Sequence, residues 1–214
     1  MRILIVGAGA LGGLVGAYLS RAGEDVTLLE VNQARARLLA DAGLRITRVG
    51  QEEETIPIHV VTSTEGLDPF DLVFIAVKTY QTEDAVRATL GATTAATRFL
   101  SLQNGIGNAE AIAGIVGPER VLCGVTYHSI EHAGPGRLRY RAGIKPIQIA
   151  ALRGAPSPEI EAIAVAFRRA GFETNVVADV DHALWQKLLH NAVVNPTSAI
   201  TGLTCREILA DEDL

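Results

Sequence analysis

A polar stripe runs along an otherwise apolar segment near the end of the 214-residue chain. Lys187, Asn191 and Asn195 recur there at intervals of four residues, within the sequence HALWQKLLHNAVVN. At about 100° per residue, this spacing places the three side chains on one narrow strip of a helix. The ammonium group could protonate a developing alkoxide, and the two carboxamides could orient a substrate carboxylate or hydroxyl. The alternative is a solvated helix face, where Glu, Lys and Gln are more usual than Asn.

A glycine-rich turn near the start of the chain could bind phosphate. It has the pattern G-x-G-x-x-G and consists of Gly7, Ala8, Gly9, Ala10, Leu11 and Gly12. Gly7 would allow the tight turn, Gly9 would let the backbone approach a pyrophosphate, and Gly12 would let a helix and a strand pack closely. The first amides of the following helix would then point at the phosphates of a dinucleotide. The alternative is a glycine-rich turn without a ligand.

Glu30 ends the next predicted strand, 18 residues after Gly12. A dinucleotide-binding fold carries at this distance the acid that binds the adenosine ribose. A carboxylate accepts hydrogen bonds from both ribose hydroxyls but repels a 2′-phosphate, so Glu30 favours NAD(H) over NADP(H). Arg35 and Arg37 lie close enough in sequence to oppose that preference. Hydride transfer from a nicotinamide to a ketone would create the negative charge that a lysine could stabilise.

Two further polar residues follow predicted strands. Lys78 comes directly after the apolar run 71–77, and Asn104-Gly105 follows the strand expected at 98–102. The carboxyl ends of parallel strands open on the crevice where such sheets bind ligands, so both residues are candidates for cofactor contact. Asn-Gly is also a strong turn signal, and a plain turn explains Asn104 equally well.

The sequence HSIEH at 128–132 matches the metal-binding motif H-x-x-E-H. That motif requires a helix, which would bring both histidines to one face. Here it follows a β-rich segment and precedes Ala133-Gly134-Pro135-Gly136. On an extended strand the two histidines would lie too far apart, so we expect no metal site.

Alternating strands and helices must position these residues. The predicted strands are 2–6, 26–30, 44–49, 56–61, 71–77, 98–102, 121–130, 136–140, 146–150 and 172–177, with an acidic turn at 51–55, and the helices are 10–21, 33–41, 81–90, 108–116 and 158–169. This order predicts an α/β protein with a doubly wound, Rossmann-type parallel sheet. From residue 182 onward only helical pattern remains, at 182–194 and 205–210, with a turn after Pro196. We therefore expect a dinucleotide-binding domain at 1–179 and the beginning of a helical substrate or dimerisation domain at 180–214.

Composition excludes several classes of protein. The net charge of −5 and 48% hydrophobic residues are typical of a soluble globular protein and argue against a nucleic-acid partner. Residues 3–20 carry no charge and could form a signal peptide or short membrane helix, but five glycines there favour a strand–turn–helix. Cys123 and Cys205 are far apart, so we expect two buried thiols, a reducing compartment and a cytoplasmic location.

Five segments together resemble the ketopantoate reductase family over essentially the whole chain: ILIVGAGALGG, AVKTY, QNGIGN, GVTYHSI and LWQKLLHNAVVNPTSAITG. The resemblance implies NADPH-dependent reduction of 2-dehydropantoate to (R)-pantoate, on the route to pantothenate and coenzyme A. It implies Lys187 as the general acid and Asn104, Asn191 and Asn195 as substrate-binding residues. It also implies cofactor contacts at Lys78, Asn104 and Ile130, beside the glycine-rich turn and Glu30.

The chain departs from that family at its end. Family members continue past the position of Leu214 with helices that complete the substrate pocket, so we expect either a truncated chain or a shortened homologue. Cys205 also stands where a polar residue is usual. The alternatives are therefore a reductase of another branched 2-oxo acid and a dinucleotide-binding module without catalysis. We expect a small 2-oxo acid as the partner, no membrane partner, and a homodimer.

Overall fold

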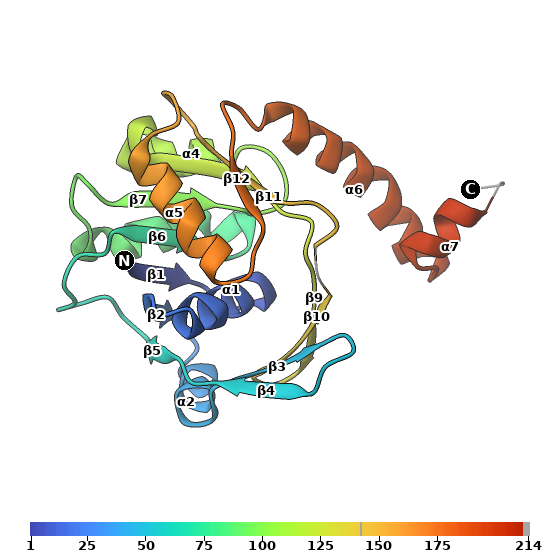
Figure 1. Ribbon diagram of the computed structural model, residues 1–214, viewed down its shortest axis with the longest axis horizontal. Coiled ribbons are helices and arrows are strands. Elements are labelled where there is room, and N and C mark those ends of the chain that lie inside the picture. Colours follow the sequence, from blue (N-terminus) through green and yellow to red (C-terminus); the bar gives the residue numbers. More distant parts are fainter. Residues whose placement is uncertain (142, 212–214) are drawn as a thin grey trace.

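The computed structural model describes residues 1–141 and 143–211, and a central sheet of eight strands organises them (Figure 1). The order of the strands is β12-β11-β8-β7-β6-β1-β2-β5. Their bounds are β1 Arg2–Val6, β2 Asp25–Leu29, β5 His59–Val61, β6 Leu72–Ile75, β7 Arg98–Ser101, β8 Val121–Val125, β11 Ile147–Ala151 and β12 Thr174–Val176. The six strands from β8 to β5 are parallel, whereas β11 runs antiparallel to β8. The predicted parallel sheet is confirmed for those six strands.

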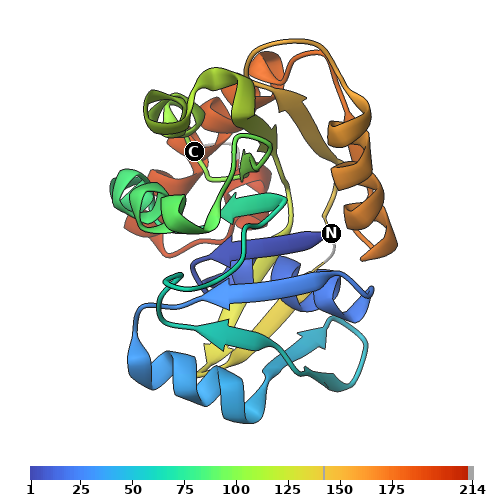
Figure 2. The ribbon, with the colours of Figure 1, turned by 90° about the vertical axis from the view of Figure 1, so that its left-hand side faces the viewer.

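Helices cover both faces of this sheet (Figure 2). Along β1, Ile3 and Ile5 belong to one hydrophobic cluster, and Leu4 and Val6 belong to the other. This alternation follows from the two-residue period of a strand buried on both faces. Helices α1 (Ala10–Arg21) and α5 (Pro158–Arg169) supply the first cluster, and α3 (Thr82–Thr89) and α4 (Asn108–Val116) the second. The doubly wound arrangement therefore follows directly from the apolar strands.

A second sheet of four strands was not expected from the sequence. It has the order β4-β3-β10-β9, with β3 at Leu44–Arg48, β4 at Glu53–Ile56, β9 at Ser129–Gly134 and β10 at Arg137–Arg141. The prediction of one strand over 121–130 is wrong, because β8 ends at Val125 and the chain crosses to β9 in the other sheet. The acidic turn predicted at 51–55 is also partly wrong, since β4 begins at Glu53. Leu138 and Leu44 of the second sheet pack against Gly13 of α1, which explains why the sheet forms there.

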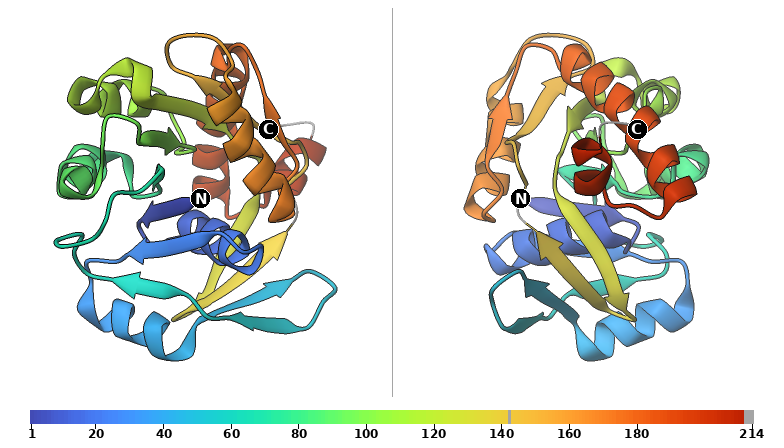
Figure 3. Two further views of the ribbon diagram at one scale, coloured as in Figure 1. Left: turned by 60° about the vertical axis from the view of Figure 1, so that its left-hand side comes forward. Right: turned by 90° about the vertical axis from the view of Figure 1, so that its right-hand side faces the viewer.

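The remaining helices lie around these sheets. They are α2 (Gln33–Ala42), α6 (Asp181–Thr201), α7 (Cys205–Ala210) and the short 3₁₀ helices η1 (Thr79–Gln81), η2 (Leu90–Ala92) and η3 (Pro118–Arg120). Figure 1 shows α6 and α7 extending away from the two sheets, and Figure 3 shows them from two further directions. The expected turn after Pro196 is wrong, because α6 continues through that proline. The helix ends instead at Gly202, which adopts φ 73°, a conformation that glycine reaches without steric cost.

The uncharged segment 3–20 forms β1 and most of α1, as the strand–turn–helix interpretation predicts. Over the described ranges, we find no helix with both the length and the apolar character needed to span a membrane. Both cysteines are free thiols. Cys123 is buried as expected, but the expectation of a buried Cys205 is wrong, because this residue is exposed at the first position of α7.

Candidate functional site

The glycine-rich turn has the shape that a dinucleotide requires. Gly7 adopts φ 104°, and its amide donates to the carbonyl of Leu29 at 3.0 Å. A Cβ at Gly12 would lie 2.2 Å from the carbonyl oxygen of Gly7 and 2.8 Å from the Cβ of Ala76, so only glycine fits there. A Cβ at Gly9 would have only the Ala76 oxygen near it, at 3.9 Å, so the space beside Gly9 is open. The amides that begin α1 have no side-chain cap and can bind an anion.

The acid at the end of β2 is fixed by its neighbours. Glu30 is only 7% exposed. Its Oε1 accepts a hydrogen bond from the Asn32 amide at 2.9 Å, and its Oε2 lies 3.3 Å from a guanidinium nitrogen of Arg35. The Arg35 side chain is 54% exposed, so it could move to another anion. The structure thus places a buried carboxylate beside a more exposed cation at the end of β2.

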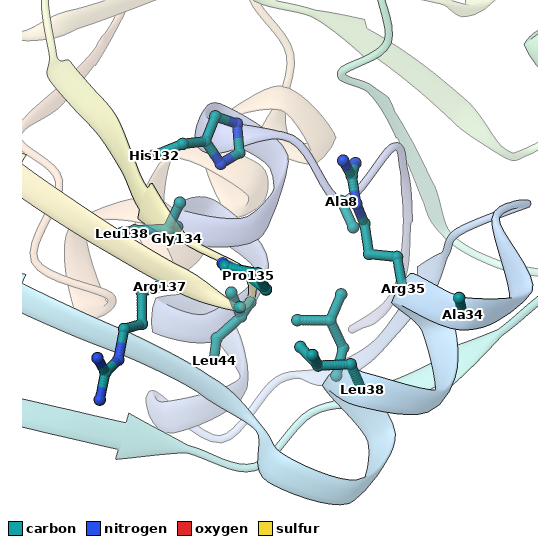
Figure 4. Close-up of a pocket in the computed structure, with 12 residues that line it drawn as sticks. Ala8, Ala34, Arg35, Leu38, Leu44, His132, Gly134, Pro135, Arg137 and Leu138 are labelled. Atoms are coloured by element: carbon teal, nitrogen blue, oxygen red, sulfur yellow. The ribbon is translucent and has the colours of Figure 1, made fainter.

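A cavity of about 460 Å³ adjoins this turn (Figure 4). It lies between α2 and the connection of β9 to β10, and Ala8 of the glycine-rich turn forms part of its wall. Leu38, Leu44 and Pro135 supply apolar surface and Arg35 extends beside it, whereas the guanidinium of Arg137, also in the lining, points away and pairs with Glu53. A ligand on the glycine-rich turn would therefore have the cavity and the Arg35 side chain beside it.

Lys187 extends from α6 to the junction between β8 and β9. Its Nζ atom donates to the carbonyl of Thr126 at 2.5 Å and lies 5.7 Å from the centre of the Tyr127 ring. Burial lowers the pKa of Lys187 to about 8, because desolvation disfavours the ammonium form. An amine with a pKa near neutrality can release a proton to substrate and recover it within one turnover.

The other polar residues of α6 differ in exposure. Asn191 is half-buried and Asn195 is exposed. On another strip of the same helix, Trp185, Leu189 and Val193 are 57%, 63% and 65% exposed. The Lys187, Asn191 and Asn195 spacing on a helix is confirmed as geometry, and their binding roles remain predictions.

Hydrogen bonds join the ends of β6 and β7. The Gln103 side chain donates to the carbonyl of Val77 at 2.8 Å, directly before Lys78. The carbonyl of Asn104 accepts from the side chain of Asn108 at 3.1 Å. Lys78 and Asn104 are both exposed. The two residues predicted after these strands therefore lie at one edge of the sheet, as expected for its carboxyl ends.

The same edge meets α6. Gly105 and Gly107, in the loop after β7, line a small cavity of about 50 Å³ together with Leu184 and Trp185. Ile130, the remaining predicted cofactor contact, is half-buried on β9, four residues after Thr126. The structure thus brings α6 to the loop after β7 and to the β8–β9 junction. It shows no direct contact between Lys187 and the side chain of Asn104.

Sequence reasoning missed the groups that hold the lysine. The acceptor is the main-chain carbonyl of Thr126. Every residue has such a carbonyl, so the residue type cannot predict this contact. His128 is part of the H-x-x-E-H motif, but it lies before β9 and its Nδ1 is 2.8 Å from the hydroxyl of Tyr140. In the part of the chain that the structure describes, no three His, Cys, Asp or Glu side chains gather in a way that could hold a metal ion.

Comparisons with known proteins match the whole length of the chain. Residues 3–154 match the family model described as "Ketopantoate reductase PanE/ApbA", and residues 179–214 match "Ketopantoate reductase PanE/ApbA C terminal". A 2-dehydropantoate 2-reductase of Halobacterium salinarum is 35% identical over 203 residues, which are 95% of this chain and 66% of the relative. One from Archaeoglobus fulgidus is 33% identical over 215 residues, covering 100% of this chain and 68% of the relative.

Solved structures show the same similarity. The crystal structure of 2-dehydropantoate 2-reductase from Geobacter metallireducens GS-15 superimposes with a TM-score of 0.88 and 33% identity, over 99% of this chain and 69% of that one. The chain therefore spans about two thirds of the length of the relatives that it matches.

Proposed function

Because the chain belongs to the ketopantoate reductase family, we propose that it takes part in reducing 2-dehydropantoate to (R)-pantoate with a hydride from a reduced nicotinamide dinucleotide. The observation that carries this proposal is the partly buried Lys187 ammonium, held 2.5 Å from the Thr126 carbonyl. A reductase needs a proton donor beside the carbonyl that it reduces. Lys187 supplies one from a helix that adjoins the edge of the dinucleotide-binding sheet.

The residues of the first turn fit the dinucleotide. The space beside Gly9 and the uncapped amides of α1 suit a pyrophosphate. Glu30 would accept hydrogen bonds from the adenosine ribose, and Lys78, Asn104 and Ile130 would contact the rest of the cofactor, as the family resemblance implies. When bound, the dinucleotide supplies the hydride.

The lysine would act as the general acid. One of its three N–H groups is used by the Thr126 carbonyl, which leaves two for substrate. As negative charge develops on the substrate oxygen, a proton would pass from Nζ to that oxygen, leaving a neutral amine that burial tolerates. Asn104, Asn191 and Asn195 would orient the substrate through neutral hydrogen bonds.

Cofactor choice depends on Glu30 and Arg35. The Glu30 carboxylate is buried and would repel a 2′-phosphate, which favours NADH. The Arg35 side chain could leave Glu30 and pair with that phosphate, which favours NADPH. We propose that the balance between these two side chains sets the preference. NADPH binding as tight as NADH binding would show that Arg35 prevails.

The test is oxidation of NADH or NADPH by the 214-residue protein in the presence of 2-dehydropantoate. Lys187→Ala should lower the rate by about two to four orders of magnitude. Lys145→Ala is the matched control, because Lys145 also lies near the Tyr127 ring, at 5.1 Å, and should leave the rate unchanged. Turnover with another branched 2-oxo acid but not with 2-dehydropantoate would identify that acid as the substrate instead. Cofactor binding without any turnover would reduce the proposal to a dinucleotide-binding module.

A further inference from the structure

A partly buried hydrogen bond lies two residues from the carbonyl that holds Lys187. It joins Nδ1 of His128 to the hydroxyl of Tyr140, at 2.8 Å. The His128 ring also meets Phe172 edge to face, with ring centres 5.4 Å apart. On its other side it packs against Gly143, where an added Cβ would come within 2.8 Å of the ring. These contacts hold the imidazole in one orientation.

The surroundings of the imidazole disfavour its protonated form. Nε2 of His128 is buried and has no hydrogen-bond partner in residues 1–141 and 143–211. Burial first, and then the charge of Lys187, lower the pKa of His128. A protonated ring would place a second positive charge in a partly buried position beside the lysine, which costs free energy. Among charged groups near the pair, Arg48 lies over the Tyr140 ring at 5.8 Å and adds a further positive charge.

The bond crosses a junction between the two sheets. Residues 126–128 leave β8 of the central sheet and enter β9 of the second sheet. Tyr140 lies on β10, where it is the register partner of Ile130 on β9. The hydrogen bond therefore fastens the junction to the second sheet at His128. The same junction carries the Thr126 carbonyl that accepts from Lys187.

We propose that the His128–Tyr140 hydrogen bond positions the Thr126 carbonyl and, through it, the Lys187 ammonium. His128 is then a positioning residue, because it acts through the three-residue junction and through Thr126. Loosening the junction would let the ammonium leave its partly desolvated position and gain water. The effect of the His128–Tyr140 hydrogen bond on turnover rests on the proposed function, whereas its effect on the titration of Lys187 does not.

The test measures that titration directly. The chain contains three lysines, Lys78, Lys145 and Lys187, so NMR of ¹³C-labelled lysine side chains resolves each one. Lys78→Arg and Lys145→Arg each remove one signal and thereby assign the third. In the wild-type protein the Lys187 midpoint should lie at about 8. Tyr140→Phe keeps the ring and removes the hydroxyl, and the midpoint should rise by about one unit as water reaches the amine.

Tyr18→Phe is the matched control. The Tyr18 ring contacts the Tyr140 ring, with centres 5.9 Å apart, and its hydroxyl interacts with Glu54 instead of His128. This variant should lose stability to a similar extent but leave the Lys187 midpoint unchanged. A general loosening of the aromatic cluster would shift the midpoint in both variants and would overturn the assignment.

Two substitutions of the histidine complete the experiment. His128→Asn places a polar atom near the position of Nδ1 and should retain the wild-type Lys187 midpoint, whereas His128→Leu should shift it as Tyr140→Phe does. In turnover, Tyr140→Phe should lower kcat by about tenfold with an unchanged dissociation constant for the cofactor. An unchanged Lys187 midpoint in both Tyr140→Phe and His128→Leu overturns the inference. If Tyr140→Phe and His128→Leu shift the Lys187 midpoint but the wild-type protein shows no turnover, only the proposed function is contradicted.

Discussion

Replacing Lys187 with methionine should make the protein more stable while removing its proton donor. The pKa of Lys187 falls from its ordinary 10.5 to about 8 because the side chain is buried. This difference corresponds to about 3 kcal/mol of unfavourable free energy for keeping the ammonium charged in the folded protein. Methionine has a similar length and no charge, but it leaves the Thr126 carbonyl without its donor, which costs about 1 kcal/mol. Lys187→Met should therefore raise the free energy of unfolding at pH 7 by about 2 kcal/mol.

The contribution of Lys187 to the free energy of unfolding depends on pH, and its sign follows from the direction of the pKa shift. Because the folded pKa lies below the unfolded value, the unfolded chain binds more protons between pH 8 and 10.5. The contribution of Lys187 to stability therefore rises with pH across that window, and the full penalty applies below it. Burial also raises the pKa of Tyr18 to about 12 and that of Cys123 to about 11. Those groups are common to both proteins, so the difference between the variant and the wild type isolates the lysine.

Urea unfolding of the two proteins at several pH values measures this difference. The advantage of Lys187→Met should be largest below pH 8, and as the pH rises towards 10.5 it should fall through zero to a deficit of about 1 kcal/mol, because the lost hydrogen bond to the Thr126 carbonyl remains. Lys145→Met is the control, because Lys145 is exposed and its replacement should change stability little at any pH. A Lys187→Met variant that is less stable than the wild type at pH 7, by an amount independent of pH, would refute the desolvation argument.

Three other results are expected. Glu30→Gln should improve the binding of NADPH relative to NADH by about tenfold, measured by calorimetry; an unchanged ratio would show that the carboxylate does not select the cofactor. Gly12→Ala should have a lowered melting temperature, since its Cβ would lie 2.2 Å from a carbonyl oxygen. Gly9→Ala should fold normally and bind the dinucleotide more weakly. Equal melting temperatures for the two variants would contradict this. A thiol reagent should label exposed Cys205 quickly and buried Cys123 slowly, as measured by mass spectrometry. Similar labelling rates for the two cysteines would argue against the fold around β8.

Local patterns in the sequence were sufficient to predict the parallel part of the central sheet and the glycine-rich turn. Continuous apolar runs such as 71–77 indicate strands buried on both faces, and the observed alternation between two hydrophobic clusters agrees with that interpretation. Helices α1, α4 and α5 have the predicted bounds, because glycine, serine or proline at their ends marks where each begins or stops. These features depend on residues close together in the chain.

Features that depend on distant contacts were not predictable. The second sheet pairs β3 with β10, roughly ninety positions apart in the sequence, and neither strand carries a signal for its partner. Pro196 interrupts the helical pattern locally, yet α6 continues, and a hydroxyl of Thr197 donates to the carbonyl of Val193 at 2.8 Å near the proline. The spacing of Lys187, Asn191 and Asn195 predicted one strip of a helix, and they do lie on α6, but their binding roles stay predictions. The acceptor that holds the lysine is a main-chain atom, which residue types cannot identify.

In the proposed reaction, a dinucleotide on the first turn of α1 and the Lys187 ammonium act on one substrate. Single-turnover reduction of 2-dehydropantoate by protein preloaded with reduced cofactor tests it most directly, with cofactor binding measured in parallel. The wild-type protein should form pantoate, and Lys187→Ala should bind the cofactor equally well while reacting about two to four orders of magnitude more slowly. Equal rates for the two proteins, or a wild-type protein that binds neither NADH nor NADPH, would contradict the account.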